Sequence, residues 1–213
     1  QAITVNITDV DEAVPNSAPS ITSSATFSAA ENQTSIGTVT ATDADGDSLT
    51  YSLSGTDANM FSIDPNGTVK IASLLDYETK DKYSVVVNTT ADDITVSKAI
   101  SVNINNINEA PTLSANLAAT NFAENSAIGA TVAIASASDP ESGTITYSLT
   151  GTDAAKFSIA SNGNVTIASD LDYETKSSYS ITVNASDGIN TASTMLAISV
   201  TDVLLDSLVT AVQ

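Results

Sequence analysis

Apolar and polar residues alternate along most of this chain, which is the period of a half-buried β-strand. Residues 36–41 alternate in this way, and residues 83–87 are aromatic or β-branched except for one serine, a composition that favours strands. Turn signals interrupt the pattern about every 8–12 residues, as in a sandwich of short strands. They are Asp45-Gly46, Pro65-Asn66-Gly67, Asn162-Gly163 and Asp187-Gly188. With no convincing helix of three turns, the pattern predicts an all-β fold built of Greek-key sandwiches.

The chain also repeats itself at an offset of 96 residues. The hexapeptide Leu-Asp-Tyr-Glu-Thr-Lys occupies residues 75–80 and returns unchanged at residues 171–176. Three shorter segments recur at the same offset, namely Tyr51-Ser52-Leu53 with Tyr147-Ser148-Leu149, Gly55-Thr56-Asp57-Ala58 with Gly151-Thr152-Asp153-Ala154, and Phe61-Ser62-Ile63 with Phe157-Ser158-Ile159. Such self-similarity is typical of tandem repeats. We therefore expect two immunoglobulin-like β-sandwich repeats, at residues 19–108 and 109–203.

The two ends of the chain lie outside these repeats. Residues 2–7 resemble residues 99–104, the expected last strand of the first repeat. Residues 1–18 are then either the final strand of a preceding repeat with its linker, or a donor strand that completes a sheet in a neighbouring subunit. Both repeats already have a final strand of their own, which favours the first interpretation. Residues 204–213 are expected to form a C-terminal tail.

The charge balance is strongly acidic, with 25 Asp and Glu residues, six Lys and Arg residues, and a net charge of −19. Binding to nucleic acid or to an anionic membrane is disfavoured, because it requires clustered cations. Cys and His are absent, which excludes disulfides, thiolate or imidazole metal sites, and Ser-His-Asp or Cys-His catalysis. No segment reaches the roughly 18 apolar residues of a membrane span, so we expect no membrane insertion. Oxygen ligands for a hard cation remain.

The acids recur at equivalent places in the two repeats. Within the repeats they are Glu31-Asn32 and Glu124-Asn125 after the first strand, Asp43-Ala44-Asp45 and Asp139-Pro140-Glu141 in a loop, Asp76-Tyr77-Glu78 and Asp172-Tyr173-Glu174 in the hexapeptide, and Asp92 or Asp93 and Asp187 after the sixth strand. Outside the repeats they are Asp9, Asp11 and Glu12, then Asn106, Asn108 and Glu109, and finally Asp202. Charged residues make up only 15% of the chain, so the acids occupy specific positions in the repeats and do not form a disordered acidic tail.

An acid-Asn pair, Asp-x-Asp, Leu-Asp-x-Glu and an inter-repeat segment ending in Ala-Pro, in this order, resemble the cadherin repeat from about residue 20 to residue 202. The segment Asn106-Ile107-Asn108-Glu109-Ala110-Pro111 looks like the short linker of bacterial cadherin-like arrays. The resemblance implies Ca²⁺ sites where the acids of one repeat, the linker and the acids of the next repeat converge. It implies one complete junction, made of Glu31, Asp76, Glu78, Asn106, the Ile107 carbonyl, Asn108, Glu109, Asp139, Glu141 and Asp187.

The resemblance also implies two half-sites. One comprises Asp9, Asp11, Glu12, Asp43, Asp45 and Asp92, and the other comprises Glu124, Asp172, Glu174 and Asp202. The chain departs from the family pattern in its linker, where Asn106 replaces the usual Asp and one residue is missing before Ala-Pro, and at Glu141, which replaces the second Asp of the loop pair. We therefore expect fewer or weaker ions than the family usually holds.

Other interpretations of the same residues carry less weight. The loop at residues 43–47 has a common turn composition and, taken alone, could be a solvated loop. A glycosidase-like pair of Asp76 and Glu78 would need one carboxyl with a raised pKa in an apolar cleft, whereas acids that share Ca²⁺ stay ionised. Tyr77 and Tyr173 are expected to pack in the core, because on an extended backbone a side chain between two ligating acids points the other way.

Together these features predict a calcium-binding extracellular adhesion or stalk module at a bacterial cell surface, and not an enzyme. Calcium at the junctions would stiffen a rod-like array of neighbouring repeats, or of identical subunits end to end, that binds a surface protein or a glycan. A filament subunit assembled through the N-terminal strand and a carbohydrate-binding module are the alternatives. The latter needs rows of exposed aromatic rings, and the chain has six Tyr, four Phe and no Trp.

Overall fold

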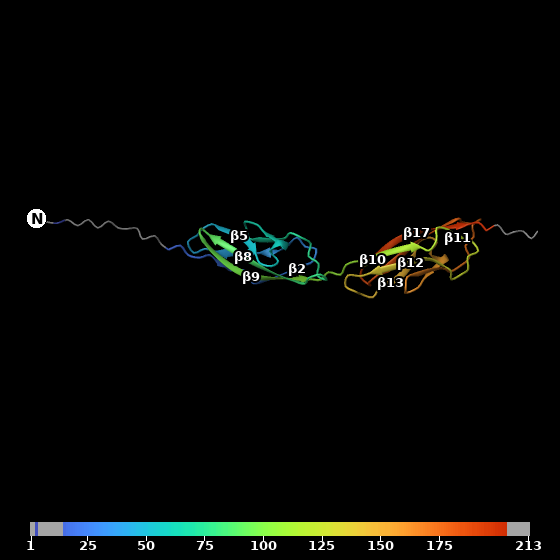
Figure 1. Ribbon diagram of the computed structural model, residues 1–213, viewed down its shortest axis with the longest axis horizontal. Coiled ribbons are helices and arrows are strands. Elements are labelled where there is room, and N and C mark those ends of the chain that lie inside the picture. Colours follow the sequence, from blue (N-terminus) through green and yellow to red (C-terminus); the bar gives the residue numbers. More distant parts are fainter. Residues whose placement is uncertain (1–2, 4–14, 204–213) are drawn as a thin grey trace, which may run out of the picture. The chain divides into compact units, whose positions relative to one another are not determined.

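The computed structural model describes Ile3 and residues 15–203 (Figure 1). Strands dominate these residues, with two short 3₁₀ turns among them. The contacts within the chain separate it into two compact units, residues 1–107 and residues 108–213. No helix in the described part of the chain is long and apolar enough to cross a membrane. The all-β tandem-repeat fold expected from the sequence is confirmed.

Unit 1 contains a four-stranded sheet in the order β2-β9-β8-β5, a three-stranded sheet in the order β3-β7-β6, and a ribbon of β1 and β4. β2 and β9 pair in parallel, while β8 pairs with β5 and β9 in the antiparallel sense. The elements are β1 Ser20–Ile21, β2 Thr26–Ala30, β3 Ser35–Thr38, β4 Ala41–Thr42, β5 Leu49–Ser54, η1 Ala58–Met60, β6 Phe61–Ile63, β7 Thr68–Ile71, β8 Lys82–Ala91 and β9 Ile94–Asn105.

Unit 2 contains two four-stranded sheets, in the orders β11-β17-β16-β13 and β10-β12-β15-β14. Its β11 pairs in parallel with β17, as β2 does with β9 in unit 1. The elements are β10 Thr112–Leu117, β11 Phe122–Ala123, β12 Thr131–Ser138, β13 Thr146–Thr150, η2 Ala154–Lys156, β14 Phe157–Ile159, β15 Asn164–Ile167, β16 Ser178–Ser186 and β17 Thr191–Thr201.

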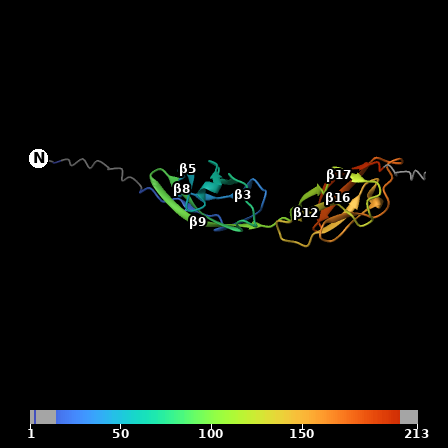
Figure 2. The same cartoon turned by 45° about the vertical axis from the view of Figure 1, so that its right-hand side comes forward.

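Strand alternation builds a separate core in each unit. β8 and β9 run side by side in both views (Figure 1, Figure 2). On β8 the side chains of Tyr83, Val85 and Val87 are buried, while Lys82 and Ser84 face solvent. Burying one such apolar side chain is worth about 1.5–3 kcal/mol. The equivalent buried residues of unit 2 are Tyr179, Ile181 and Val183.

The strand expected at residues 36–41 is interrupted. β3 ends at Thr38, and the predicted alternation is wrong beyond Gly37, because Ile36 and Val39 are both buried. The register against β7 shifts just before Gly37, which marks a β-bulge. Gly37 permits the bulge, since its φ is +138° and a Cβ there would lie 3.0 Å from the ring of Phe27.

Two equivalent turns require glycine, one in each unit. Gly67 and Gly163 have φ values of +81° and +83°, which favour a residue without a Cβ. A Cβ would overlap the backbone oxygen of Val39 in the first turn and that of Ala135 in the second. The N–H groups of Val39 and Ala135 also donate to the carbonyl oxygens of the two glycines, at 2.8 and 2.9 Å. Each turn is therefore held directly against a neighbouring segment, which is the residue after β3 in unit 1 and strand β12 in unit 2.

Alanine substitutions in unit 2 test this close approach. Gly188 has a φ of +98° but open space around its Cβ position, so Gly188→Ala should cost only about 1 kcal/mol from backbone strain. Gly163→Ala should cost about 1–3 kcal/mol more, because the added methyl overlaps Ala135. Urea unfolding followed by circular dichroism measures both losses, and equal losses would contradict the packing of this turn.

Candidate metal sites

Glu31 is the buried centre of the first group of acids. It follows β2 directly and is 1% exposed. Its Oε1 accepts a hydrogen bond from the backbone N–H of Ile107 at 2.6 Å, and its Oε2 accepts one from the backbone N–H of Tyr77 at 2.8 Å. One carboxylate thus ties together the end of β2, the hexapeptide loop and the segment after β9. Because a carboxylate has about four acceptor positions, both oxygens keep a lone pair for a cation.

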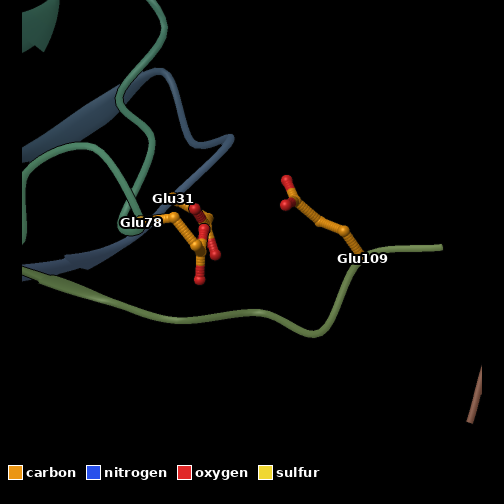
Figure 3. Close-up of side chains that lie close together, drawn as sticks. All are labelled: Glu31, Glu78 and Glu109. Carbon is orange, nitrogen blue, oxygen red and sulfur yellow. The ribbon is translucent and has the colours of Figure 1, made fainter. Parts of the chain in front are cut away.

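Glu78 and Asn106 lie beside Glu31 in unit 1, and together with Asp76 we call these residues the Glu31 cluster. An oxygen of Glu78 lies within 4.8 Å of an oxygen of Glu31, and Figure 3 shows the two side chains next to each other. The Asn106 amide donates a 2.9 Å hydrogen bond to Oε1 of Glu78. Glu109, also drawn in Figure 3, belongs to unit 2.

Asp76 is oriented by its own loop. The Thr79 hydroxyl donates to Oδ2 of Asp76 at 2.7 Å, and the Thr79 N–H donates to Oδ1 at 3.2 Å. These hydrogen bonds, the hydroxyl first, lower the pKa of Asp76 below its usual value. Thr175 makes the same two bonds to Asp172 in unit 2, where they lower the pKa of Asp172. Both aspartates are therefore ionised and held in place at neutral pH.

The loop after β4 brings together three acids that we call the Asp43 cluster: Asp43, Asp45 and Asp47 have oxygens within 4.8 Å of one another. The N–H groups of Asp45 and Asp47 donate to Oδ1 of Asp43 at 2.9 and 3.3 Å, and the N–H of Ser17 donates to Oδ2 of Asp45 at 2.7 Å. Burial raises the pKa of Asp47, and repulsion from nearby carboxylates, Asp92 foremost, raises it further. Asp47 was not among the ligands predicted from the sequence, although it lies two residues after Asp45 in the same acidic loop.

In unit 2 two consecutive linker residues bind the equivalent acids. The Asn108 amide donates to Oδ2 of Asp187 at 2.7 Å and lowers the pKa of that carboxyl. The N–H of Glu109 donates to Oε1 of Glu141 at 3.0 Å. Asn190, which was not predicted from the sequence, donates its amide to the Asn108 carbonyl at 2.9 Å and its N–H to Oδ1 of Asp187 at 2.6 Å. These bonds hold Asn108 and Asp187 together.

A third group, the Glu124 cluster, comprises Glu124, Asp172 and Glu174 of unit 2, which have oxygens within 4.8 Å of one another. The N–H groups of Val203 and Tyr173 donate to the two oxygens of Glu124 at 2.9 and 3.0 Å, and together they lower its pKa. Asp202 lines the same cavity of about 650 Å³ as Glu124 and Glu174. The residues of the second expected half-site thus lie close together within unit 2.

Three ligands expected from the sequence lie outside the described residues, and the expected burial of two tyrosines is wrong. Asp9, Asp11 and Glu12 lie outside the described residues. Tyr77 and Tyr173 do not pack in the core and are 36% and 38% exposed. The expectation was wrong because the middle of each hexapeptide forms a turn, so its side chains do not alternate as on an extended strand.

The donors in these groups suit a hard cation. All the ligand atoms on offer are carboxylate, carbonyl or amide oxygens, the donors that Ca²⁺ prefers. Oδ2 of Asp43, Oδ2 of Asp139 and Oε2 of Glu141 are buried without a hydrogen-bond partner among the described residues. A buried charged oxygen without a partner is costly, and a cation would offset that cost. The residues present therefore fit Ca²⁺.

A family model described as Cadherin domain matches the chain twice, at residues 23–105 and 119–201. The chain belongs to the cadherin family. Human Cadherin-23 is 32% identical to this cadherin over 173 residues and human Protocadherin Fat 4 is 34% identical over 160 residues. These matches cover 76% and 68% of the chain but only 5% and 3% of the two relatives. This cadherin chain thus spans a small part of the length of those proteins.

Solved cadherin structures share the fold. Human Protocadherin-24 EC1-2 (Form II) superposes with a TM-score of 0.61 and 27% identity, over 88% of this chain and 100% of that one. Drosophila N-cadherin EC1-4 gives a TM-score of 0.60 over 88% of this chain and 50% of that one, and its 24% identity supports the fold alone. Cadherin domains bind Ca²⁺ in general, are not enzymes and are typically extracellular.

Glutamine at position 31 tests the structural part of the first cluster. Glu31→Gln turns one acceptor into a donor that faces the N–H of Ile107 or Tyr77, so a buried donor loses its partner. We expect a loss of about 1–3 kcal/mol in unfolding free energy, measured by urea denaturation in EDTA. Glu124→Gln makes the same change at an equivalent but less buried pair of bonds, so it should cost less. Equal losses would contradict the special burial of Glu31.

Proposed function

We propose that this cadherin chain is a calcium-binding adhesion or stalk module in which Ca²⁺ at the repeat junction stiffens a rod-like array. The observation that supports it most is the buried Oδ2 atom of Asp43 and of its equivalent Asp139. Neither atom has a hydrogen-bond partner in the described part of the chain, although the other oxygen of each carboxylate accepts backbone N–H bonds. Because the same carboxylate oxygen lacks a partner in both repeats, a ligand common to both sites explains it better than an irregularity of one loop.

The ligands proposed for the complete junction come from unit 1, the linker and unit 2. They are Glu31, Asp76, Glu78, Asn106, the Ile107 carbonyl, Asn108, Glu109, Asp139, Glu141 and Asp187. Within unit 1 Asn106 binds Glu78, and within unit 2 Asn108 binds Asp187. Neighbouring residues of one short segment are thus attached to acids of both repeats. The Asp43 cluster with Asp92, and the Glu124 cluster with Asp202, are proposed as half-sites for further neighbours.

Electrostatics gives the proposed stiffening its physical basis. Salt screens charges over about 8 Å at physiological ionic strength. Carboxylate oxygens in the Asp43 cluster and the Glu124 cluster lie within 4.8 Å of one another, so they repel with little screening. A bound Ca²⁺ would neutralise such acids and replace repulsion with shared coordination by about six to eight oxygens. Without it, acids gathered near the linker would push the segment towards more open conformations.

The proposed setting is a bacterial cell surface, with neighbouring repeats or identical subunits end to end as the first partners. The family supports an extracellular location, and the acidic surface disfavours nucleic acid and anionic membranes. A surface protein or a glycan is the proposed ligand of the assembled array.

Small-angle scattering of the full chain tests the stiffening. Addition of Ca²⁺ should increase the maximum dimension and narrow the distribution of distances relative to EDTA, because the linker is held in one arrangement. Limited proteolysis should show cleavage near residues 105–111 in EDTA and protection in Ca²⁺. Identical scattering in the two conditions would contradict the proposal.

Matched variants separate the bound ion from general charge effects. Asp187→Asn removes a proposed ligand and should abolish the response to Ca²⁺ at the junction. Asp64→Asn removes a partly exposed acid that pairs with Lys70 outside every cluster, and should leave the response unchanged. Loss of the response in both variants would point to net charge, not to a site.

A further inference from the structure

The last residue of each hexapeptide is a lysine whose ammonium pairs with an aspartate from another loop. Lys80 forms an ion pair with Asp57, with Nζ 2.6 Å from Oδ1, and Lys176 forms the same pair with Asp153 at 2.6 Å. The aspartates belong to the Gly-Thr-Asp-Ala segments, 23 residues earlier in both repeats. The side chains of Asp57 and Asp153 are only 13% and 10% exposed, so each pair is shielded on its carboxylate side.

The aspartate of each pair is a fixed anchor. Oδ2 of Asp57 accepts the N–H of Ser84 at 2.8 Å, and Oδ2 of Asp153 accepts the N–H of Ser180 at 2.7 Å. Both bonds are made to the start of the long strand β8 or β16. The lysine ammonium, followed by this N–H, lowers the pKa of Asp57 below its usual value, so the anchor is ionised at neutral pH.

The lysine is attached to the acid-bearing loop at its other end. The N–H of Lys80 donates to the carbonyl of Asp76 at 2.9 Å and closes the turn that carries Glu78. Its ammonium lies over the ring of Tyr83, 4.7 Å from the centroid, and Tyr83 meets Phe61 edge-to-face in the core. These contacts tie the ammonium to Asp57 and to the ring of Tyr83.

A lysine at this position can compete with a metal cation for the neighbouring carboxylates. Its ammonium is a mobile point charge on a flexible stem, and it follows Glu78 by two residues in a chain with few other cations. If it were released, Asp76 and Glu78, which precede it by four and two residues, would be acceptors in the same loop, and an ammonium bound there would compete directly with Ca²⁺.

We propose that Asp57 and Asp153 are positioning residues that sequester Lys80 and Lys176, and so keep the hexapeptide acids available to a divalent cation. This inference rests on the proposed calcium function and assigns it two residues that bind no metal themselves. Unit 1 is the cleaner place to test it, because it carries Met60 where unit 2 has Lys156, a second cation that lowers the pKa of Asp172.

Calcium titration calorimetry of the full chain and its variants provides the test. Asp57→Asn should weaken Ca²⁺ binding about tenfold, at the lower end of what loss of an outer support costs a metal site. The double variant Asp57→Asn with Lys80→Met should recover most of this loss, because the competing ammonium is gone. Lys80→Arg should keep the wild-type affinity if the guanidinium pairs with Asp57, and Asp64→Asn is the control for an ion pair elsewhere. Asp153→Asn repeats the test independently in unit 2.

The outcomes separate sequestration from a merely structural ion pair. A structural role would lower thermal stability in EDTA and give no recovery in the double variant, which would overturn the inference. Unchanged affinity in both Asp57→Asn and Asp153→Asn would overturn it as well. If the wild-type chain bound no Ca²⁺, the proposed function itself would fail and this inference with it. The inference is supported if the wild-type chain binds Ca²⁺, Asp57→Asn binds it more weakly, and the double variant recovers the affinity.

Discussion

Repulsion between like charges is the constraint that the other features of this molecule have to satisfy. The chain gathers carboxylates whose oxygens lie within 4.8 Å of one another, and it has only six lysines with which to balance 25 acids. Hydrogen bonds from backbone N–H groups and amide side chains, rather than lysines, stabilise most of these carboxylates. Glu31 and Glu124 each accept two N–H bonds, and Asp76 is held by Thr79. For Glu124 and Asp76 these hydrogen bonds lower the pKa, and at all three acids they supply positive dipoles without placing a positive side chain where a metal would bind.

The topology of the sandwich explains why these donors are within reach. β2 runs parallel to β9, with Ala30 opposite Asn105, so the residues that follow both strands leave the sheet at the same end. Glu31 therefore meets the segment that begins at Asn106. The parallel pairing of β11 with β17 repeats this in unit 2, where Glu124 meets Val203. An antiparallel pairing would have sent the two continuations to opposite ends and separated the acid from the linker.

The sequence predicted the repeats and most clustered acids because these features are local or periodic. The hexapeptide recurs intact, and alternation marks strands such as β8 and β16. What it missed depends on packing between distant segments. The bulge at Gly37 reflects the ring of Phe27, and the pairing of Asp57 with Lys80 joins two loops that are 23 residues apart in the sequence. The hexapeptide tyrosines are exposed because they lie in a turn. The hydrophobic periodicity of the sequence does not predict such a turn.

The two repeats share one plan but differ where their loops could hold an ion. In unit 1 the loop at residues 43–47 supplies three carboxylates. The equivalent loop of unit 2, at residues 139–143, has Gly143 in place of Asp47 and the longer Glu141 in place of Asp45. In unit 2 the amide of Asn108 binds Asp187 instead, which satisfies the acid without adding charge. Calcium affinity in proteins is tuned by the number of charged ligands and by the rigidity of the site. Under the proposed function, the junctions of such an array would therefore fill at different calcium concentrations, because each loop contributes a different charge to the ion that it shares with its neighbour.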